Sequence, residues 1–182
     1  MVQLETERLV LRKPEPGDAD GYAEIWGDPE VIRFLGGRTQ TREESARGIE
    51  RMLKQWDRHG VGLFSVLQKE DERLIGRVGY LLWDPETWAN AMHEELEEPL
   101  EMEIGWVIAS AFWNQGYATE AAAACRDNAF GALGRERVIS LIAAENVASI
   151  RVAEKIGERY ERDVEIMVGP VGVYSLEKDP AR

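Results

Sequence analysis

Apolar residues recur at two different spacings along the chain, and these spacings predict where helices and strands form. The clearest helical pattern begins after Thr41 and Glu44, which match the T-x-x-E capping box that starts many helices. In the segment that follows, apolar residues recur at i, i+3, i+4 and i+7: Ile49, Met52, Leu53 and Trp56. This spacing places them on one face of a helix that we expect to end near Gly60.

Shorter patterns predict the remaining elements. Strands are predicted over residues 4–13, 61–68, 73–83, 101–109 and 137–144, with weaker candidates over 159–168 and 171–177. Helices are predicted over residues 18–26, 29–35, 118–133 and 145–157, the last with Gly157 as its C-terminal cap. Residues 84–99 break the strand pattern and are expected to form a loop.

The order of these elements indicates the fold class. Helices interrupt strands throughout, and the strand–loop–helix–strand unit from Glu101 to Ala144 resembles a right-handed crossover. One face of its helix carries mostly small residues: Ala122, Cys125, Ala129 and Leu133. We therefore expect another element to pack closely there. The class is α/β or α+β, with one mixed sheet in a single domain over residues 1–182.

The charge balance argues against two classes of partner. The 182 residues include 22 Lys and Arg and 34 Asp and Glu, which gives a net charge of −12. Nucleic-acid binding depends on basic side chains that neutralise phosphates, and anionic membranes attract the same side chains. We therefore expect neither nucleic acid nor a membrane as a partner.

The residue content also limits metal and disulfide chemistry. Cys125 is the only cysteine, and His59 and His93 are the only histidines. An intramolecular disulfide is therefore excluded, and a Cys- or His-based metal site is not expected. No window approaches the ~20 apolar residues that span a bilayer, and the chain begins without a signal-peptide pattern. The expected location is the cytoplasm.

The segment FWNQGYATEA, residues 112–121, places small residues where a loop turns into the 118–133 helix. The first turn of a helix leaves backbone N–H groups without intrahelical partners, and the helix dipole adds positive charge there. Gly116 and Ala118 would let a phosphate group approach these N–H groups closely. A glycine needed only for an unusual backbone dihedral explains the same residue equally well. The turn matches neither a P-loop nor the G-x-G-x-x-G fingerprint.

Three ordered blocks and the N-terminal segment together resemble one protein family. The blocks are EIGW at 103–106, FWNQGYATEA at 112–121 and ENVASIRVAEKIG at 145–157, and the N-terminal segment is ETERLVLRKPEPGDADGYAEIWGDPEVIRFLGG. They resemble the Gcn5-related N-acetyltransferase (GNAT) superfamily, and within it the ribosomal-protein N-acetyltransferase (RimJ/RimL-type) branch. The resemblance implies a mostly antiparallel central sheet, flanked by helices and splayed at the acyl-coenzyme A site.

The same resemblance implies an activity. It is the transfer of an acetyl group from acetyl-CoA, as cosubstrate and without a metal, to a primary amine. Direct attack would occur in a ternary complex, and the amine would be a peptide or protein N-terminus or a small cationic amine. Two alternatives stay open: a CoA-binding sensor or interaction domain with little turnover, and an enzyme that uses another acyl-CoA such as succinyl-CoA. Family members often form homodimers, so a homodimer is also expected.

Residue positions carry over from the family motif one by one. The pyrophosphate of acetyl-CoA would be held by the loop and helix start: Asn114, Gln115, Gly116, Tyr117, Ala118 and Thr119. Trp113 stands where the broad signature Q/R-x-x-G-x-G/A begins, although aromatic residues are usual there in this branch. Asn146 matches an asparagine near the pantetheine arm, but an ordinary helix N-cap explains it nearly as well. A backbone N–H from the strand segment Trp106, Val107 and Ile108 would stabilise the oxyanion.

Two side chains are candidates for proton transfer. Glu103 lies within an otherwise apolar strand, where partial burial would raise its pKa toward a value useful for a base. A glutamate that faces solvent or forms an ion pair is the simpler alternative. Ser149 matches a serine of the RimJ/RimL-type branch and is the candidate acid or thiol-contacting hydroxyl, although a first-turn helix serine is equally plausible. Tyr160 and Tyr174 are fallback donors.

The acceptor side of the site offers only a charge pattern. The predicted loop before the 101–109 strand and the strand's first residue carry five glutamates: Glu94, Glu95, Glu97, Glu98 and Glu101. If they surround the acceptor cleft they would favour a cationic amine, but such a run more often forms a solvated surface.

Overall fold

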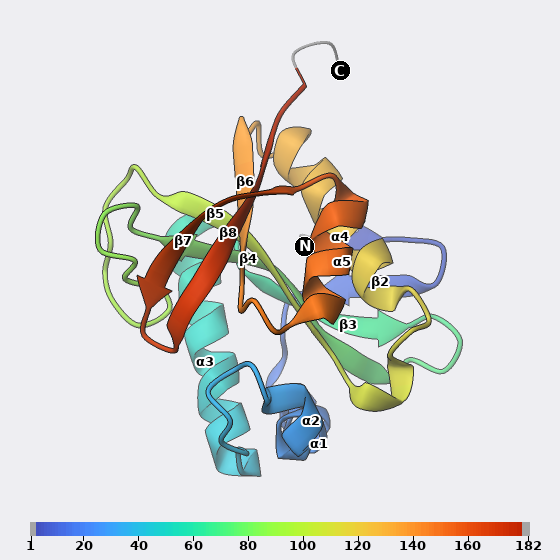
Figure 1. Ribbon diagram of the computed structural model, residues 1–182. Helices are drawn as coiled ribbons and strands as arrows, with labels where there is room; N and C mark the ends of the chain where they lie inside the picture. The colour runs from blue at the N-terminus through green and yellow to red at the C-terminus, as the bar shows by residue number, and fades with distance from the viewer. Residues whose placement is uncertain (1–2, 180–182) are drawn as a thin grey trace.

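The computed structural model describes residues 3–179, and all of the strands in this part of the chain join one sheet (Figure 1). The order across the sheet is β1-β2-β3-β4-β5-β6-β8-β7. The strands are β1 (Gln3–Glu5), β2 (Leu9–Arg12), β3 (Leu63–Gln68), β4 (Leu74–Trp83), β5 (Glu101–Ile108), β6 (Arg137–Ile142), β7 (Arg159–Ile166) and β8 (Gly169–Glu177). The helices are α1 (Ala19–Gly27), α2 (Pro29–Ile32), α3 (Arg42–His59), α4 (Tyr117–Phe130) and α5 (Val147–Ile156).

The sheet is antiparallel except at one pair of neighbours, β5 and β6. These two run parallel because α4 lies between them in the sequence and returns the chain to the same edge, as the crossover pattern predicts. Their register contains a single pair, Glu103 with Ile139. By contrast, β4 and β5 pair continuously from Gly76–Ile108 to Trp83–Glu101. The sheet is thus held together weakly between β5 and β6, and Glu103 lies at that place.

Two hydrophobic clusters cover the two faces of the sheet. One joins α1, α2 and α3 to β3 and β5 through residues such as Tyr22, Ile49 and Val107. The other joins α4 to the central strands through residues such as Ala122 and Ile104. Figure 1 shows α1, α2 and α3 grouped together, away from α4 and α5. This arrangement confirms an α/β fold built on one mixed, mostly antiparallel sheet flanked by helices.

Local signals explain where two of the helices lie. The capping box of α3 forms as predicted, because the Thr41 side chain accepts from the Glu44 N–H while Glu44 accepts from the Thr41 N–H. The same helix ends at Gly60 in the left-handed conformation. On α4 the small residues Ala122, Cys125 and Ala129 are fully buried. The Tyr80 hydroxyl donates a 2.7 Å hydrogen bond to the Cys125 carbonyl, so the small face does permit close packing.

Three predicted boundaries were wrong. The strand predicted over 4–13 is a hairpin, β1 and β2, because Thr6 forms a turn by accepting from the Leu9 N–H at 2.9 Å. The helix predicted to Leu133 ends at Phe130, although Leu133 still packs against the core. The helix predicted over 29–35 is confined to Pro29–Ile32. Among the described residues no helix is long and apolar enough to cross a membrane.

Candidate functional site

A cavity of about 650 Å³ opens beside the weak junction of β5 and β6. Its walls come from the segment before α3, from α3, β4, β5 and β6, from the start of β3 and of α5, from the segment between β4 and β5, and from the β7–β8 hairpin. Of the side chains predicted from the sequence, it brings together Glu103, Trp106, Val107, Asn146 and Ser149. Ile108 and residues 114–119 do not line it. The predicted site is therefore divided between this cavity and a separate surface at the start of α4.

Glu103 is buried, with 7% of its surface exposed, and it lines the cavity from β5. Burial raises the pKa of its carboxyl group to about 7, although the Trp83 side chain, the Leu141 main chain and the charge of Arg77 each work to lower it. The indole Nε1 of Trp83 donates to Glu103 Oε2 at 2.6 Å. The simpler alternatives, a solvent-exposed carboxylate or a surface ion pair, are thus wrong. A carboxyl group that titrates near neutral pH can accept a proton from a nearby ammonium group.

A second buried carboxyl group lies close to Glu103 and escaped the sequence prediction. Glu158 is fully buried, and its Oε1 is 3.1 Å from the Ser140 hydroxyl. Burial raises the pKa of Glu158 to about 8, which Ser140 counteracts and the charge of Glu103 reinforces. Ser140 also donates to the Ile104 carbonyl at 2.8 Å. Two neighbouring carboxyl groups with raised pKa values disfavour simultaneous ionisation, so charge on one raises the pKa of the other.

The backbone of β5 presents donors to the gap between β5 and β6. The Ile104 carbonyl accepts from Ser140 of β6, so the polar groups of Ile104 face β6 rather than β4. Because N–H and C=O groups of one strand residue point to the same side and alternate along the strand, the Trp106 N–H faces β6 as well. Val107 then faces β4, its register partner being Arg77. Of the three predicted oxyanion donors, Trp106 and Ile108 have the required direction.

Ser149 and Asn146 lie at the start of α5, facing the cavity. The indole Nε1 of Trp106 donates to Ser149 Oγ at 3.3 Å, which leaves the hydroxyl hydrogen of Ser149 available as a donor. The side chain of Asn146 accepts from the Ser149 N–H at 3.2 Å. Asn146 therefore caps α5, as the alternative explanation predicts, while still lining the cavity. Tyr160 and Tyr174 pack edge to face against each other on β7 and β8 and do not line the cavity.

The start of α4 has the features that a diphosphate requires. Gly116 is the N-cap residue in the left-handed conformation, with φ of 85°, and no side chain caps the helix. Asn114 also has positive φ, at 59°. The N–H groups of Tyr117, Ala118 and Thr119 belong to the first turn, where no intrahelical carbonyl is available. Residues 113–116 are exposed, so an anion can reach these N–H groups.

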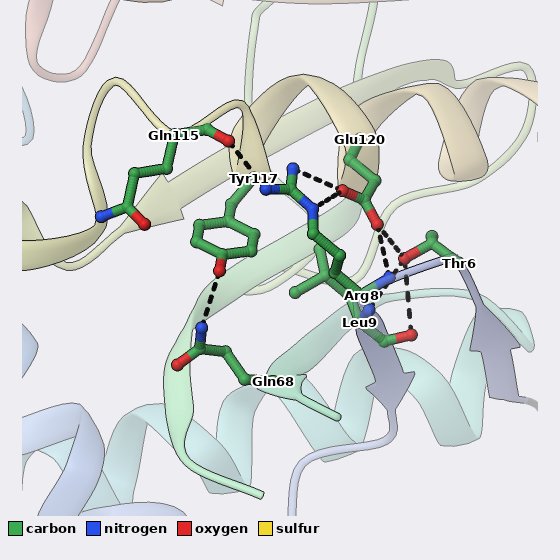
Figure 2. Close-up of polar contacts among 7 residues, drawn as sticks. All are labelled: Thr6, Arg8, Leu9, Gln68, Gln115, Tyr117 and Glu120. Atoms are coloured by element: carbon green, nitrogen blue, oxygen red, sulfur yellow. Dashed lines mark hydrogen bonds and ion pairs between the residues drawn. The ribbon is translucent and has the colours of Figure 1, made fainter. Parts of the chain in front are cut away.

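A polar network holds this loop against the turn between β1 and β2 (Figure 2). The guanidinium of Arg8 contacts both Glu120, at 2.6 and 2.7 Å, and the Gln115 carbonyl, at 2.9 Å, while it stacks over the Tyr117 ring. Burial works to raise the pKa of Glu120, but hydrogen bonds from Thr6 and Arg8 outweigh it and hold that pKa below its ordinary value. On the other side, the Trp113 indole donates to the Ile108 carbonyl at 2.7 Å. The loop conformation is thus set both from the β1–β2 turn and from β5.

The segment between β4 and β5 lines the cavity mainly through residues other than its glutamates, namely Trp88, Ala89, Asn90, Met92 and His93. Of the five glutamates singled out in the sequence only Glu94 is part of the lining. Glu95 pairs with Arg58, and Glu101 pairs with Arg137, both away from the cavity. The expectation that these glutamates together surround the acceptor cleft was therefore wrong for four of the five.

The cavity also contains residues that sequence reasoning missed. Arg51 of α3 and Arg77 of β4 both line it. Arg77 had a detectable signal, since it is a charged residue within the apolar run LIGRVGYLL, the same argument that singled out Glu103. Arg51 had none, because a polar residue beside an apolar helical stripe is ordinary.

Comparison with known proteins supports one family. Residues 8–159 match the family model described as "Acetyltransferase (GNAT) domain". The chain is 32% identical to the uncharacterized protein YkkB of Bacillus subtilis (strain 168), with 94% of each chain covered. It is 31% identical to the uncharacterized N-acetyltransferase p20 of Bacillus licheniformis, covering 98% of this chain and 97% of that one. The structure resembles that of an acetyltransferase (GNAT family) from Bacillus anthracis, with TM-score 0.78, 25% identity and coverage of 97% and 98%.

Proposed function

Because the chain belongs to the GNAT acetyltransferase family, we propose that it transfers the acetyl group of acetyl-CoA to a primary amine, within a ternary complex. The observation that carries the proposal is the position of Glu103. It is a buried carboxyl group with a pKa of about 7, in a cavity beside the strand gap. The acceptor would be the N-terminus of a peptide or protein, as in the RimJ/RimL-type branch, or a small amine.

The residues at the start of α4 fit coenzyme A. The N–H groups of residues 114–119 would hold the pyrophosphate, because they follow an exposed loop, lie at a positively polarised helix end and have no side chain at Gly116 to obstruct them. Asn146, at the cavity wall, would contact the pantetheine arm. The bound cosubstrate supplies an acetyl thioester, whose carbonyl carbon is the electrophile.

Glu103 would act as the base. A primary amine with a lysine-like pKa of about 10.4 is almost entirely protonated at neutral pH and cannot attack a carbonyl in that form. A carboxyl group whose pKa is about 7 can remove the proton, either directly or through a water molecule. Trp83 positions Glu103 through its short hydrogen bond. The proton would then reside on Glu103, in a cavity where the neutral acid is tolerated.

Two groups would stabilise the charges that develop. The Trp106 N–H faces the gap between β5 and β6 and would donate to the carbonyl oxygen as it becomes negative. The Ser149 hydroxyl, already positioned by Trp106, would donate to the departing sulfur. The cavity places both groups in the same region as Glu103.

The direct test combines a binding and a turnover measurement on the full chain. Calorimetry with coenzyme A is expected to show one site. Thiol release from acetyl-CoA, followed with a panel of primary amines and peptides and with mass spectrometry of the products, is expected to show a mass increase of one acetyl group. Binding of coenzyme A without acetylation of any amine in the panel would contradict the proposed activity.

Ser149→Ala is expected to lower kcat by about 5- to 10-fold, the effect of losing one hydrogen bond worth roughly 1 to 1.5 kcal/mol. The KM for acetyl-CoA should stay near the wild-type value, because the hydroxyl would act mainly on the departing sulfur. Steady-state kinetics at several acetyl-CoA concentrations separates the two parameters. The matched control is Ser175→Ala, which removes the hydroxyl of a serine on β8 outside the cavity. A wild-type kcat in Ser149→Ala would remove the serine from the mechanism.

A further inference from the structure

Two arginine side chains in the cavity have no carboxylate partner among residues 3–179. Arg51 extends from α3 and Arg77 from β4, and both line the cavity. Nε of Arg51 is buried without any hydrogen-bond partner. The guanidinium of Arg77 stacks on the Trp26 ring at 4.7 Å, and no hydrogen bond or salt bridge joins it to another described residue. Unpaired cationic groups in a partly buried position are energetically unfavourable unless a ligand neutralises them.

The nearby acidic groups are already engaged elsewhere. Asp18 forms a two-point ion pair with Arg12, at 2.6 and 2.9 Å, and accepts from Ser65 at 2.7 Å. Burial raises the pKa of Tyr22 to about 12, so its phenol is neutral and balances no positive charge. Glu103 attracts Arg77 electrostatically, but its Oε2 accepts from Trp83 and it is the group that the proposed reaction uses. No other acidic group among the described residues therefore balances the positive charges of the two arginines.

The two guanidinium groups also act on each other. Burial lowers the pKa of Arg77, and the charge of Arg51 lowers it further, while Tyr22 and Glu103 oppose this effect. Two cations held near each other favour an anion that both can contact. The guanidinium of Arg77 lies over the Trp26 ring, and its N–H donors have no hydrogen-bond partner among the described residues. Such donors match the two oxygens of a carboxylate or phosphate group.

We propose that the acceptor amine also carries a carboxylate or phosphate group, and that Arg51 and Arg77 bind this group. The inference rests on the proposed acetyltransferase function. It places the amino group at Glu103 and the anionic group toward the α3 side of the same cavity. The matching acceptors are amino acids, short acidic peptides and phosphorylated amines. Polycations are disfavoured, because Glu94 is the only glutamate besides Glu103 among the described residues of the lining.

The geometry of the sheet limits the size of such an acceptor. Arg77 pairs with Val107, and Glu103 lies four residues earlier on the same strand. Four residues correspond to roughly 13 Å at about 3.3 Å per residue, and residues an even number apart share one face of the sheet. Both side chains line the same cavity and interact electrostatically, so the amino and anionic groups of the acceptor should be separated by no more than about that distance. A small molecule or the end of a peptide fits this limit.

The first experiment compares acceptors that differ in whether they carry an anionic group. Pairs of substrates would be assayed with acetyl-CoA: glutamate and its diamide, a dipeptide and its C-terminal amide, and phosphoethanolamine and ethanolamine, with spermidine as a polycation. The acidic member of a pair is expected to have a KM at least about 10-fold lower than the member without the anionic group. The carboxylate and phosphate pairs distinguish which of the two anions the site takes.

The second experiment tests the arginines themselves. Arg51→Gln and Arg77→Gln are each expected to raise the KM for the acidic acceptor by about 10- to 100-fold, the effect of one charge-assisted contact. The KM for the matching amine without the anionic group and the affinity for coenzyme A should not change. Arg47→Gln, an exposed residue on the same helix, removes the same charge outside the cavity and should have no effect. Melting temperatures verify folding, and Arg51→Gln keeps the test valid if Arg77→Gln does not fold.

A binding arm separates this inference from the proposed function. Glutarate and inorganic phosphate, which lack an amino group, would be titrated calorimetrically into wild-type protein and both variants. Anion binding that depends on Arg51 and Arg77 would support the anion site. If no amine is acetylated as well, the proposed acetyltransferase function is contradicted, and with it the assignment of the anion to an acceptor amine. Acetylation of amines without preference for the acidic members would overturn the inference and leave the function intact. The inference would also be overturned if Arg51→Gln and Arg77→Gln both retained the preference for acidic acceptors.

Discussion

Glu103→Gln is expected to lower kcat at pH 7 by about 10²- to 10⁴-fold, the range for loss of a general acid or base. Glutamine matches the shape of the side chain and can still accept from Trp83, but it cannot take a proton. Because burial raises the pKa of Glu103 to about 7, the wild-type rate should rise as pH increases through about 7, when the carboxyl group loses its proton. The pH–rate profile of the variant should lack this rise. The difference in kcat between the variant and the wild type should decrease at high pH, where a larger fraction of the amine is already unprotonated.

The pH profile of kcat is the measurement that decides this prediction. Trp83→Phe serves as an independent variant, because it removes a hydrogen bond that works to lower the pKa of Glu103. Its rising limb should move to higher pH, while its rate at high pH should approach that of the wild type. The affinity for coenzyme A, measured by calorimetry, should be unaffected in Glu103→Gln. A variant with full activity and an unchanged pH profile would exclude Glu103 as the base.

Gly116→Asp is expected to weaken coenzyme A binding by about 100-fold or more, since like charges brought together cost several kcal/mol. The carboxylate would stand at the N-cap, beside the N–H groups proposed to hold the pyrophosphate. An added Cβ would also lie 3.4 Å from an Arg8 guanidinium nitrogen. Asp is one of the residues that adopt positive φ most readily, so the backbone change should be tolerated. The Kd for coenzyme A from calorimetry tests this expectation.

The matched control for this change is Gly134→Asp. Gly134 also has positive φ, at 61°, and an added Cβ there would meet nothing within 4 Å. The substitution therefore introduces the same charge and the same backbone demand outside the start of α4, and its Kd should equal that of the wild type. Gly116→Asn separates charge from shape and should bind coenzyme A more tightly than Gly116→Asp. Equal binding by Gly116→Asp and the wild type would show that the pyrophosphate is held elsewhere.

Local sequence signals predicted most of the secondary structure because their causes are local. The capping box at Thr41 and Glu44, the left-handed caps at Gly60 and Gly157, and the apolar stripe of α3 each act within a few residues. One error occurred where a side chain formed a turn that the hydrophobic pattern does not reveal. Thr6 divides the first predicted strand in this way. Leu9 and Leu11 of the predicted strand are nevertheless fully buried, on β2.

The candidate site was predictable only in part. Glu103 was detectable as a charged residue within an apolar strand, and the same reasoning applied consistently would have found Arg77. Glu158 was not detectable, because a glutamate that follows a helix-capping glycine is ordinary until Ser140 and Glu103 are known to surround it. The acidic segment misled the prediction. Its glutamates form ion pairs such as Glu95 with Arg58, which no spacing in the sequence reveals.

The sequence by itself determined the helices and strands, the mixed sheet with its crossover, and the exposed turn at Gly116, because each depends on neighbouring residues and on backbone conformation. Only the tertiary structure decided the pKa of Glu103, the unpaired state of Arg51 and Arg77, and the anchoring of the α4 loop by Arg8. Those properties depend on partners such as Trp83, 20 residues from Glu103, and Glu120, 112 residues from Arg8. Burial and charge balance are set by such distant contacts, which local sequence patterns do not specify.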